Sequence, residues 1–161
     1  MTEADTLDAL RHSKFAAELT EAQCKALAGR MTLRDLSPGE VLIREGHPDN
    51  HLYAVVEGSV GVVKHAGTPD AVTLHTLGVG DFIDELGFID GTEPYASKLA
   101  IGKARVLGLE REQLEALLAT QPHIVYNVMR AIIRTVHQIQ RRLAMHSVEL
   151  TNYIYKQHGR Y

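Results

Sequence analysis

The sequence contains a single cysteine, Cys24, and no tryptophan among its 161 residues. One cysteine excludes an internal disulfide, so we expect a reducing, cytoplasmic environment and a packing role for Cys24. No apolar run approaches the roughly 20 residues of a membrane-spanning helix. The acidic first residues, MTEADTLDAL, do not have the pattern of a signal peptide. These absences indicate a globular chain with no membrane partner.

An excess of positive charge is also missing. The chain has 17 Lys and Arg against 20 Asp and Glu, which gives a net charge of −3 with histidine neutral. Proteins that bind nucleic acid or acidic membranes usually present basic patches, so neither partner is expected. Hydrophobic residues make up 45% of the chain, enough for one domain with an appendage to bury a core.

The distribution of glycine, proline and apolar residues divides the chain into three zones. Residues 1–30 are predicted to form a helical lead-in, in which TEAQ at 20–23 fits a capping box and Gly29 is placed to end a helix. Residues 31–110 have the pattern of a β domain. Residues 111–161 are predicted to contain a short helix and then a long one.

The β zone consists of short apolar runs separated by turn residues. Such runs at near-regular spacing predict an antiparallel sandwich or barrel. The predicted strands are MTLRDL (31–36), EVLIRE (40–45), LYAVVEG (52–58), SVGVVKH (59–65), AVTLHTL (71–77), YASKLAI (95–101) and RVLGLE (105–110).

The long helix has no glycine or proline from His123 to Tyr153, and its apolar residues recur at alternating spacings of four and three. This is a heptad seam. A helix of roughly 50 Å overhangs a small barrel, so we expect a homodimer through this seam rather than packing on its own domain alone. The seam comprises Val125, Met129, Ile132, Val136, Ile139, Leu143, His146, Leu150 and Tyr153.

Three local patterns occur in order in the middle of the chain: PGEVLIREGHPDNHLYAVVEGSVGV (38–62), GDFIDELGFIDGT (80–92) and VLGLEREQLEALL (106–118). Together they resemble the cyclic-nucleotide-binding domain family, which includes bacterial catabolite-activator and Fnr regulators and the regulatory subunits of cAMP-dependent kinase. The resemblance covers about residues 10–145. It implies a mainly β fold: N-terminal helices, a double-stranded β-helix (jelly roll) and a long C-terminal helix that often dimerises.

Residues 80–97 resemble the phosphate-binding cassette of this family. In the family, the glutamate matching Glu85 binds the ribose 2′-hydroxyl, and an arginine nine or ten residues later pairs with the phosphate. Pro94 and Tyr95 occupy those two positions here. The resemblance therefore implies a ligand site that lacks its arginine and consists of Gly80, Phe82, Glu85, Leu86, Gly87, Tyr95, Ala96 and Ser97.

Strand alternation predicts which cassette side chains face the pocket. The predicted inward face comprises Tyr95, Ser97, Leu99 and Ile101. Lys98 is then predicted to point away. Tyr95 either donates to an uncharged ligand or fills the space of the arginine, and Glu85 either binds ribose or holds the turn through backbone N–H groups. Because a charge-assisted hydrogen bond contributes roughly 1.5–3 kcal/mol, we expect weak binding of cAMP and cGMP.

Polar residues of the long helix leave further alternatives open. His146 either fixes the register of a dimer, with a pH-sensitive association, or lies solvated at a splayed helix end. The arginines are expected to form a solvated face or to reach a partner. In some family members this helix touches the ligand, which makes Asn127 and Arg134 candidate contacts.

These observations favour a non-enzymatic regulatory or sensor module for a cyclic nucleotide or another small-molecule effector. The alternatives are a dimeric scaffold for a protein partner, with a closed pocket, and a cupin-like metal protein. No H-x-H pair and no Ser/His/Asp or Cys/His arrangement is present, so we expect neither a metal site nor catalytic residues. The chain ends soon after the long helix, so direct DNA binding is not expected.

Overall fold

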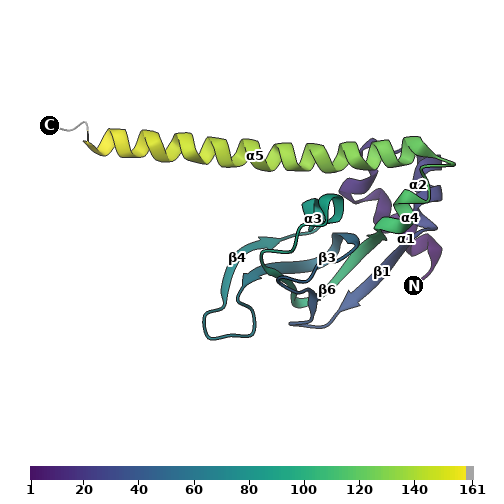
Figure 1. Ribbon diagram of the computed structural model, residues 1–161, viewed down its shortest axis with the longest axis horizontal. Helices are drawn as coiled ribbons and strands as arrows, with labels where there is room; N and C mark the ends of the chain where they lie inside the picture. The colour runs from purple at the N-terminus through teal and green to yellow at the C-terminus, as the bar shows by residue number, and fades with distance from the viewer. Residues whose placement is uncertain (159–161) are drawn as a thin grey trace.

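The computed structural model describes residues 1–158, and helices at both ends of the chain flank six strands (Figure 1). In chain order the elements are α1 (Glu3–Arg11), η1 (Lys14–Glu18), α2 (Glu21–Ala28), β1 (Met31–Leu36), β2 (Val41–Ile43), β3 (His51–Lys64), β4 (Val72–Leu77), β5 (Phe82–Ile83), α3 (Glu85–Asp90), β6 (Ser97–Glu110), α4 (Arg111–Glu115) and α5 (Pro122–His158).

The two longest strands, β3 and β6, form the spine of the sheet. Each has 14 residues, and they pair antiparallel from His51 opposite Glu110 to Val63 opposite Ser97. β1 and β2 pair with β6, whereas β4 and β5 pair with β3. The predicted mainly β fold with flanking helices and a long C-terminal helix is confirmed.

The sequence predicts separate strands at 52–58 and 59–65 and at 95–101 and 105–110, but each of these two pairs forms one continuous strand with a bend. The runs at 52–58 and 59–65 form the single strand β3, and the runs on either side of Gly102 form β6. Gly58 and Gly102 have φ angles of 76° and 67°. A bulge with glycine at positive φ bends a strand without ending it, which short-range patterns do not distinguish from a turn.

Alternation along β3 divides the interior into two clusters. Leu52 and Ala54 belong to a helix-side core, which also contains residues of α1, α2 and α5. Tyr53 and Val55 face the opposite way, into a roll core formed by the strands themselves. Both faces of the spine are therefore buried, as expected for a strand sandwiched between two layers.

The second lead-in helix forms where its cap residues predict it. Thr20 and Gln23 make both hydrogen bonds of a capping box at the start of α2, and Gly29 is its C-cap. A second capping box, between Thr2 and Asp5, begins α1. Cys24 is buried in α2, which raises the pKa of its thiol, so it serves in packing rather than as a reactive group.

The predicted dimer seam is divided by the fold. Its first part packs on the chain's own domain: Val125, Met129, Ile132 and Val136. Ile132 is fully buried in the chain's own core and is therefore not free for a seam between chains, whereas Val125, Met129 and Val136 are only partly buried and their place in the seam stays a prediction. A 3.5-residue period suits packing on one's own core equally well. The rest of the seam lies on the exposed half of α5, which extends beyond the domain (Figure 1): Ile139, Leu143, His146, Leu150 and Tyr153.

Polar contacts fasten the first half of α5 to the lead-in. Arg134 Nη1 lies 2.8 Å from Glu18 Oε1, and Arg130 Nε lies 3.7 Å from Glu18 Oε2. Asn127 Nδ2 donates to Gln23 Oε1 at 3.2 Å. Asn127 and Arg134, considered above as ligand contacts, are thus engaged by the N-terminal helices. Arg130 and Arg134 nevertheless remain exposed, so they lie on a solvated face, as predicted, while pairing with Glu18.

Two adjacent isoleucines of α5 provide a test of how it packs. Ile132 is fully buried, whereas Ile133 is 58% exposed. We predict that Ile132→Ala lowers the free energy of unfolding by about 2–5 kcal/mol. Ile133→Ala, the matched control, should change it by less than about 0.5 kcal/mol. Urea titration followed by circular dichroism measures both, and equal effects would contradict this placement of the helix.

Candidate functional site

The cassette lies between β5 and β6 and is anchored by aromatic side chains. Phe82 of β5 packs edge to face on Phe15 of η1, with ring centroids 4.9 Å apart. Phe88 of α3 is buried in the helix-side core. The short helix α3 therefore has one face fixed against the lead-in, while Leu86 and Ile89 remain exposed.

Charged residues from outside the cassette fix its ends. Arg111 donates from Nε to the Phe88 carbonyl at 2.8 Å and from Nη2 to the Gly87 carbonyl at 3.1 Å. Lys14 Nζ lies 3.1 Å from Asp81 Oδ1. Sequence reasoning missed both contacts; the position of Arg111 directly after the last strand was the only available signal.

The loop before β6 is tied to the β2–β3 connection. Ser97 Oγ accepts a hydrogen bond from the Glu45 N–H at 3.0 Å, and the Gly46 N–H donates to the Pro94 carbonyl at 2.9 Å. Lys64 Nζ donates to the Tyr95 carbonyl at 2.8 Å and pairs with the Glu45 carboxylate. The hydroxyl of Ser97 already has a structural partner here.

The inward face predicted for the start of β6 is wrong. Tyr95 lies in a bend before the strand and is 65% exposed, and Ile101 is also exposed. The buried residues are Ala96, Lys98 and Ala100, together with Ser97.

The register explains the difference. Lys98 lies opposite Val62 of β3, and Ala100 lies opposite Val60. Both valines are buried, and residues directly opposite on paired strands share a face. A shift of one residue in the alternation moves every side chain to the other face, so Lys98, which was predicted to point away, is only 4% exposed.

Lys98 forms a buried ion pair with Asp84 of the cassette. Lys98 Nζ lies 3.7 Å from Asp84 Oδ1, and the two side chains are 5% and 9% exposed. The ammonium also lies 5.2 Å from the centroid of the Tyr95 ring. Within residues 1–158, Asp84 Oδ2 is buried without a hydrogen-bond partner. A lysine and an aspartate thus occupy the interior of the cassette where no cation was expected.

Asp84 also has an unusual backbone conformation. It is the N-cap residue of α3 with φ 63° and ψ 40°, and its side chain makes no capping hydrogen bond. Left-handed backbone costs a non-glycine residue about 1–2 kcal/mol. A Cβ at Gly87 would lie 2.6 Å from Asp84 Oδ2, so only glycine leaves room for this carboxylate.

The pKa values of the pair reflect its burial. Burial raises the pKa of the Asp84 carboxyl above its ordinary value, although Lys98 acts to lower it. Burial lowers the pKa of the Lys98 ammonium, although Asp84 and Glu85 act to raise it. Desolvation therefore opposes both charges more strongly than their attraction favours them.

The remaining predicted site residues have different surroundings. Glu85, at the start of α3, is half-buried, and within residues 1–158 its carboxylate makes no hydrogen bond or ion pair. The alternative in which it holds the turn through backbone N–H groups is therefore not supported. Gly80 has φ 92°, and its N–H donates to the Val55 carbonyl at 2.8 Å.

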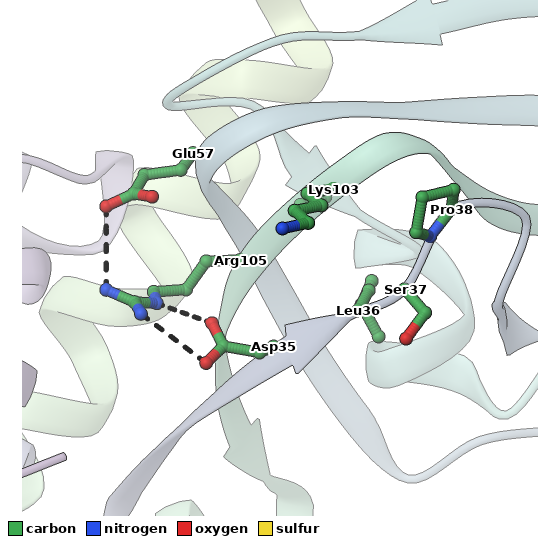
Figure 2. Close-up of a pocket in the computed structure, with 8 residues that line it drawn as sticks. Asp35, Leu36, Ser37, Pro38, Glu57, Lys103 and Arg105 are labelled. Carbon is green, nitrogen blue, oxygen red and sulfur yellow. Dashed lines mark hydrogen bonds and ion pairs between the residues drawn. The ribbon is translucent and has the colours of Figure 1, made fainter.

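Two surface cavities lie outside the cassette. The larger, about 400 Å³, is lined by residues of β1, β3 and β6. Figure 2 shows Arg105 in this cavity between Asp35 and Glu57, at 2.7 and 3.5 Å, whereas Lys103 lies apart. The smaller, about 220 Å³, includes Gly108. Because the charge of Arg105 is already paired with carboxylates of the chain, the larger cavity does not indicate a ligand.

Residues 1–158 contain no group of three or more His, Cys, Asp or Glu side chains arranged to hold a metal ion. Over the same range, none of the helices combines the length and the apolar character needed to cross a membrane.

Comparison with known proteins identifies the family. The family model described as "Cyclic nucleotide-binding domain" matches residues 33–121, more than half of the chain. The chain therefore belongs to the cyclic nucleotide-binding domain family. A CRP-like cAMP-activated global transcriptional regulator of Mycobacterium tuberculosis is 25% identical over 119 residues, which cover 74% of this chain and 53% of the regulator. The chain thus spans about half the length of this relative.

Solved structures show the same fold. A cyclic nucleotide-binding domain from Methylobacillus flagellatus superposes with a TM-score of 0.73 at 24% identity, covering 87% of this chain and 79% of that one. The N-terminal domain of a transcriptional regulator from Streptomyces coelicolor gives 0.69 at 26% identity, covering 84% and 95%. The predicted jelly roll with flanking helices is confirmed.

The buried pair predicts how substitutions at its two members interact. Lys98→Met leaves Asp84 as an uncompensated buried charge and should lower the free energy of unfolding at neutral pH by about 3–5 kcal/mol. The loss should shrink as the pH falls, because protonation of a carboxyl whose folded pKa is raised removes the penalty. Asp84→Asn combined with Lys98→Met should restore most of the stability. Urea titrations at two pH values measure this, and an undiminished stability of Lys98→Met would argue against the pair.

Proposed function

We propose that this chain is a non-enzymatic regulatory or sensor module that binds a small-molecule effector in its cassette. The observation that carries the proposal is a formed cassette in which the Glu85 carboxylate makes no hydrogen bond or ion pair within residues 1–158, although its charge acts on Lys98. A half-buried carboxylate at the start of a fixed turn is available to accept hydrogen bonds from ligand hydroxyl groups.

The relatives support a regulatory role. The Mycobacterium regulator is named as cAMP-activated, and the Thermus thermophilus relative is a cyclic AMP receptor protein. Activation by a bound effector is the property that we transfer to this chain as a proposal. The proposal also includes a cytoplasmic location and no direct DNA binding, both of which are expected from composition and charge.

We propose further that cAMP and cGMP bind weakly. Pro94 and Tyr95 stand where the family arginine is expected, and the ring of Tyr95 lies largely in solvent. Lys98, the one buried Lys or Arg among residues 1–158, is paired with Asp84. A ligand phosphate therefore meets a cation whose charge is already neutralised. Loss of the charge-assisted pair between arginine and phosphate corresponds to a dissociation constant about ten- to a hundredfold larger.

A panel of effectors tests the sensor role. We predict that at least one member of a panel of cyclic and linear nucleotides and other small metabolites raises the melting temperature saturably, because a ligand that binds only the folded state stabilises it. Glu85→Ala should abolish that rise. The matched control is Glu93→Ala, an exposed carboxylate of the same loop, which should leave it intact. A rise that survives Glu85→Ala would contradict the proposed site.

We propose that the module acts as a homodimer through the exposed half of α5. Large apolar side chains recur along it at heptad spacing, including Leu143 and Leu150, which are largely exposed. Exposed apolar residues also lie on the edge strand β4, at Val72 and Leu74. An exposed apolar stripe such as that on α5 is typical of an association site, and a second copy of the same helix matches its period.

Sedimentation velocity at micromolar concentration should therefore show a dimer. Leu143→Asp with Leu150→Asp should produce a folded monomer, because both charges would be buried in the seam. Met145→Asp is the matched control: Met145 is also exposed but lies off the seam, so the dimer should persist. A wild-type monomer under these conditions would refute the proposal.

One observation favours a second candidate, a dimeric scaffold with a closed pocket. The Asp84–Lys98 pair already fills part of the cassette interior, and the exposed Leu86 and Ile89 of α3 offer a surface to a protein partner. The effector panel discriminates between the two, since a scaffold would show no saturable change in melting temperature with any ligand.

A further inference from the structure

The charges of the buried pair are both incompletely satisfied. An ammonium has three N–H donors and a carboxylate has about four acceptor positions. Within residues 1–158, the contacts of the Lys98 ammonium are Asp84 Oδ1 at 3.7 Å and the face of the Tyr95 ring at 5.2 Å. Asp84 Oδ2 has no hydrogen-bond partner there. A charge-assisted N–H···O bond is ordinarily 2.7–2.9 Å long, so this pair is loose.

The pair is poorly suited to stabilising the fold. A buried ion pair offsets its desolvation only when its geometry is good and its remaining hydrogen-bonding positions are filled. Here neither condition holds, and Asp84 additionally adopts left-handed backbone. Buried charges kept under these conditions are candidates for a functional site.

The position of the Asp84 carboxylate indicates what this site accepts. The carboxylate makes no capping hydrogen bond to α3, lies against Gly87 in its first turn and pairs with Lys98. An anionic group that belongs to the chain itself is thus held beside the one buried cation of the cassette. Glu85 and Asp49 are close enough to act on the ionisation of Asp84, so a second anion would be repelled while Asp84 is charged and in place.

We propose that Lys98 is the anion-binding cation of the cassette and that the Asp84 carboxylate occupies it until a phosphate-bearing ligand displaces it. This inference rests on the proposed effector site and adds the identity of its cation and its internal competitor. The ligand phosphate would give the Lys98 ammonium the short hydrogen bonds that Asp84 does not provide. Tyr95, at the position of the missing arginine, has no part in holding the phosphate.

The test compares binding of cAMP and of adenosine, which lacks the phosphate, to four proteins by calorimetry. Asp84→Asn keeps a residue that tolerates left-handed backbone but removes the charge. It should bind cAMP about ten- to hundredfold more tightly than wild type and bind adenosine no more tightly. Asp84→Asn with Lys98→Met should lose the gain. Glu93→Gln, the matched loss of an exposed carboxylate in the same loop, should leave cAMP binding within about twofold of wild type, a difference of about 0.4 kcal/mol.

Three outcomes would overturn the proposal: no gain in Asp84→Asn, a gain that persists with Lys98→Met, or an equal gain for adenosine. If Asp84→Asn does not fold, Asp84→Gly replaces it, because glycine suits φ 63°. Failure here is distinguishable from failure of the sensor role. If a ligand of the effector panel binds in a Glu85-dependent manner, the sensor role holds even when Lys98 binds no phosphate. If no ligand of the panel raises the melting temperature of wild type but Asp84→Asn binds cAMP more tightly through Lys98, the chain has an anion site that Asp84 blocks.

Discussion

The pairing of β3 with β6 is the interaction on which the rest of this structure depends. Every other strand of the sheet is attached to one of these two. Their alternating side chains form both the helix-side core and the roll core. The cassette connects β5, which pairs with β3, to the start of β6. The register of the two long strands therefore decides which side chains line the interior of the cassette.

That register places Lys98 inside and leaves Tyr95 outside. A buried lysine requires a counter-charge, and the nearest part of the chain that provides one is the turn into α3, where Asp84 adopts left-handed backbone. Gly87 leaves space for the carboxylate. Lys98, Asp84 and Gly87 thus form a connected set of residues, and we interpret it as a cassette occupied by its own carboxylate, with this pair in place of the arginine that the family resemblance implies.

Much of the architecture was predictable because it depends on local signals. The capping box at Thr20 and the glycine at position 29 mark the ends of a helix through short-range hydrogen bonding and backbone conformation, and both are where the sequence predicts them. The cassette was located from its glycines and Glu85, although the family resemblance and not composition gave it a function.

The errors concern features that depend on long-range pairing. The inward face of β6 follows from its partner residues on β3, and Tyr95 precedes the strand, so alternation counted from Tyr95 started in the wrong place. The heptad period of α5 did not reveal that Ile132 packs on its own domain, because both arrangements bury the same stripe. The contacts of Arg111 with α3 join residues more than 20 positions apart, so no local sequence pattern predicts them.

The central claim is that Asp84 is a buried carboxylate held against Lys98, and a carbon-detected NMR titration of its carboxyl tests this most directly. Burial should raise the pKa of Asp84 above its ordinary value of 3.8, and removal of the ammonium in Lys98→Met should raise it further, since Lys98 acts to lower it. An Asp84 carboxyl that titrates at its ordinary value and does not respond to Lys98→Met would contradict the account.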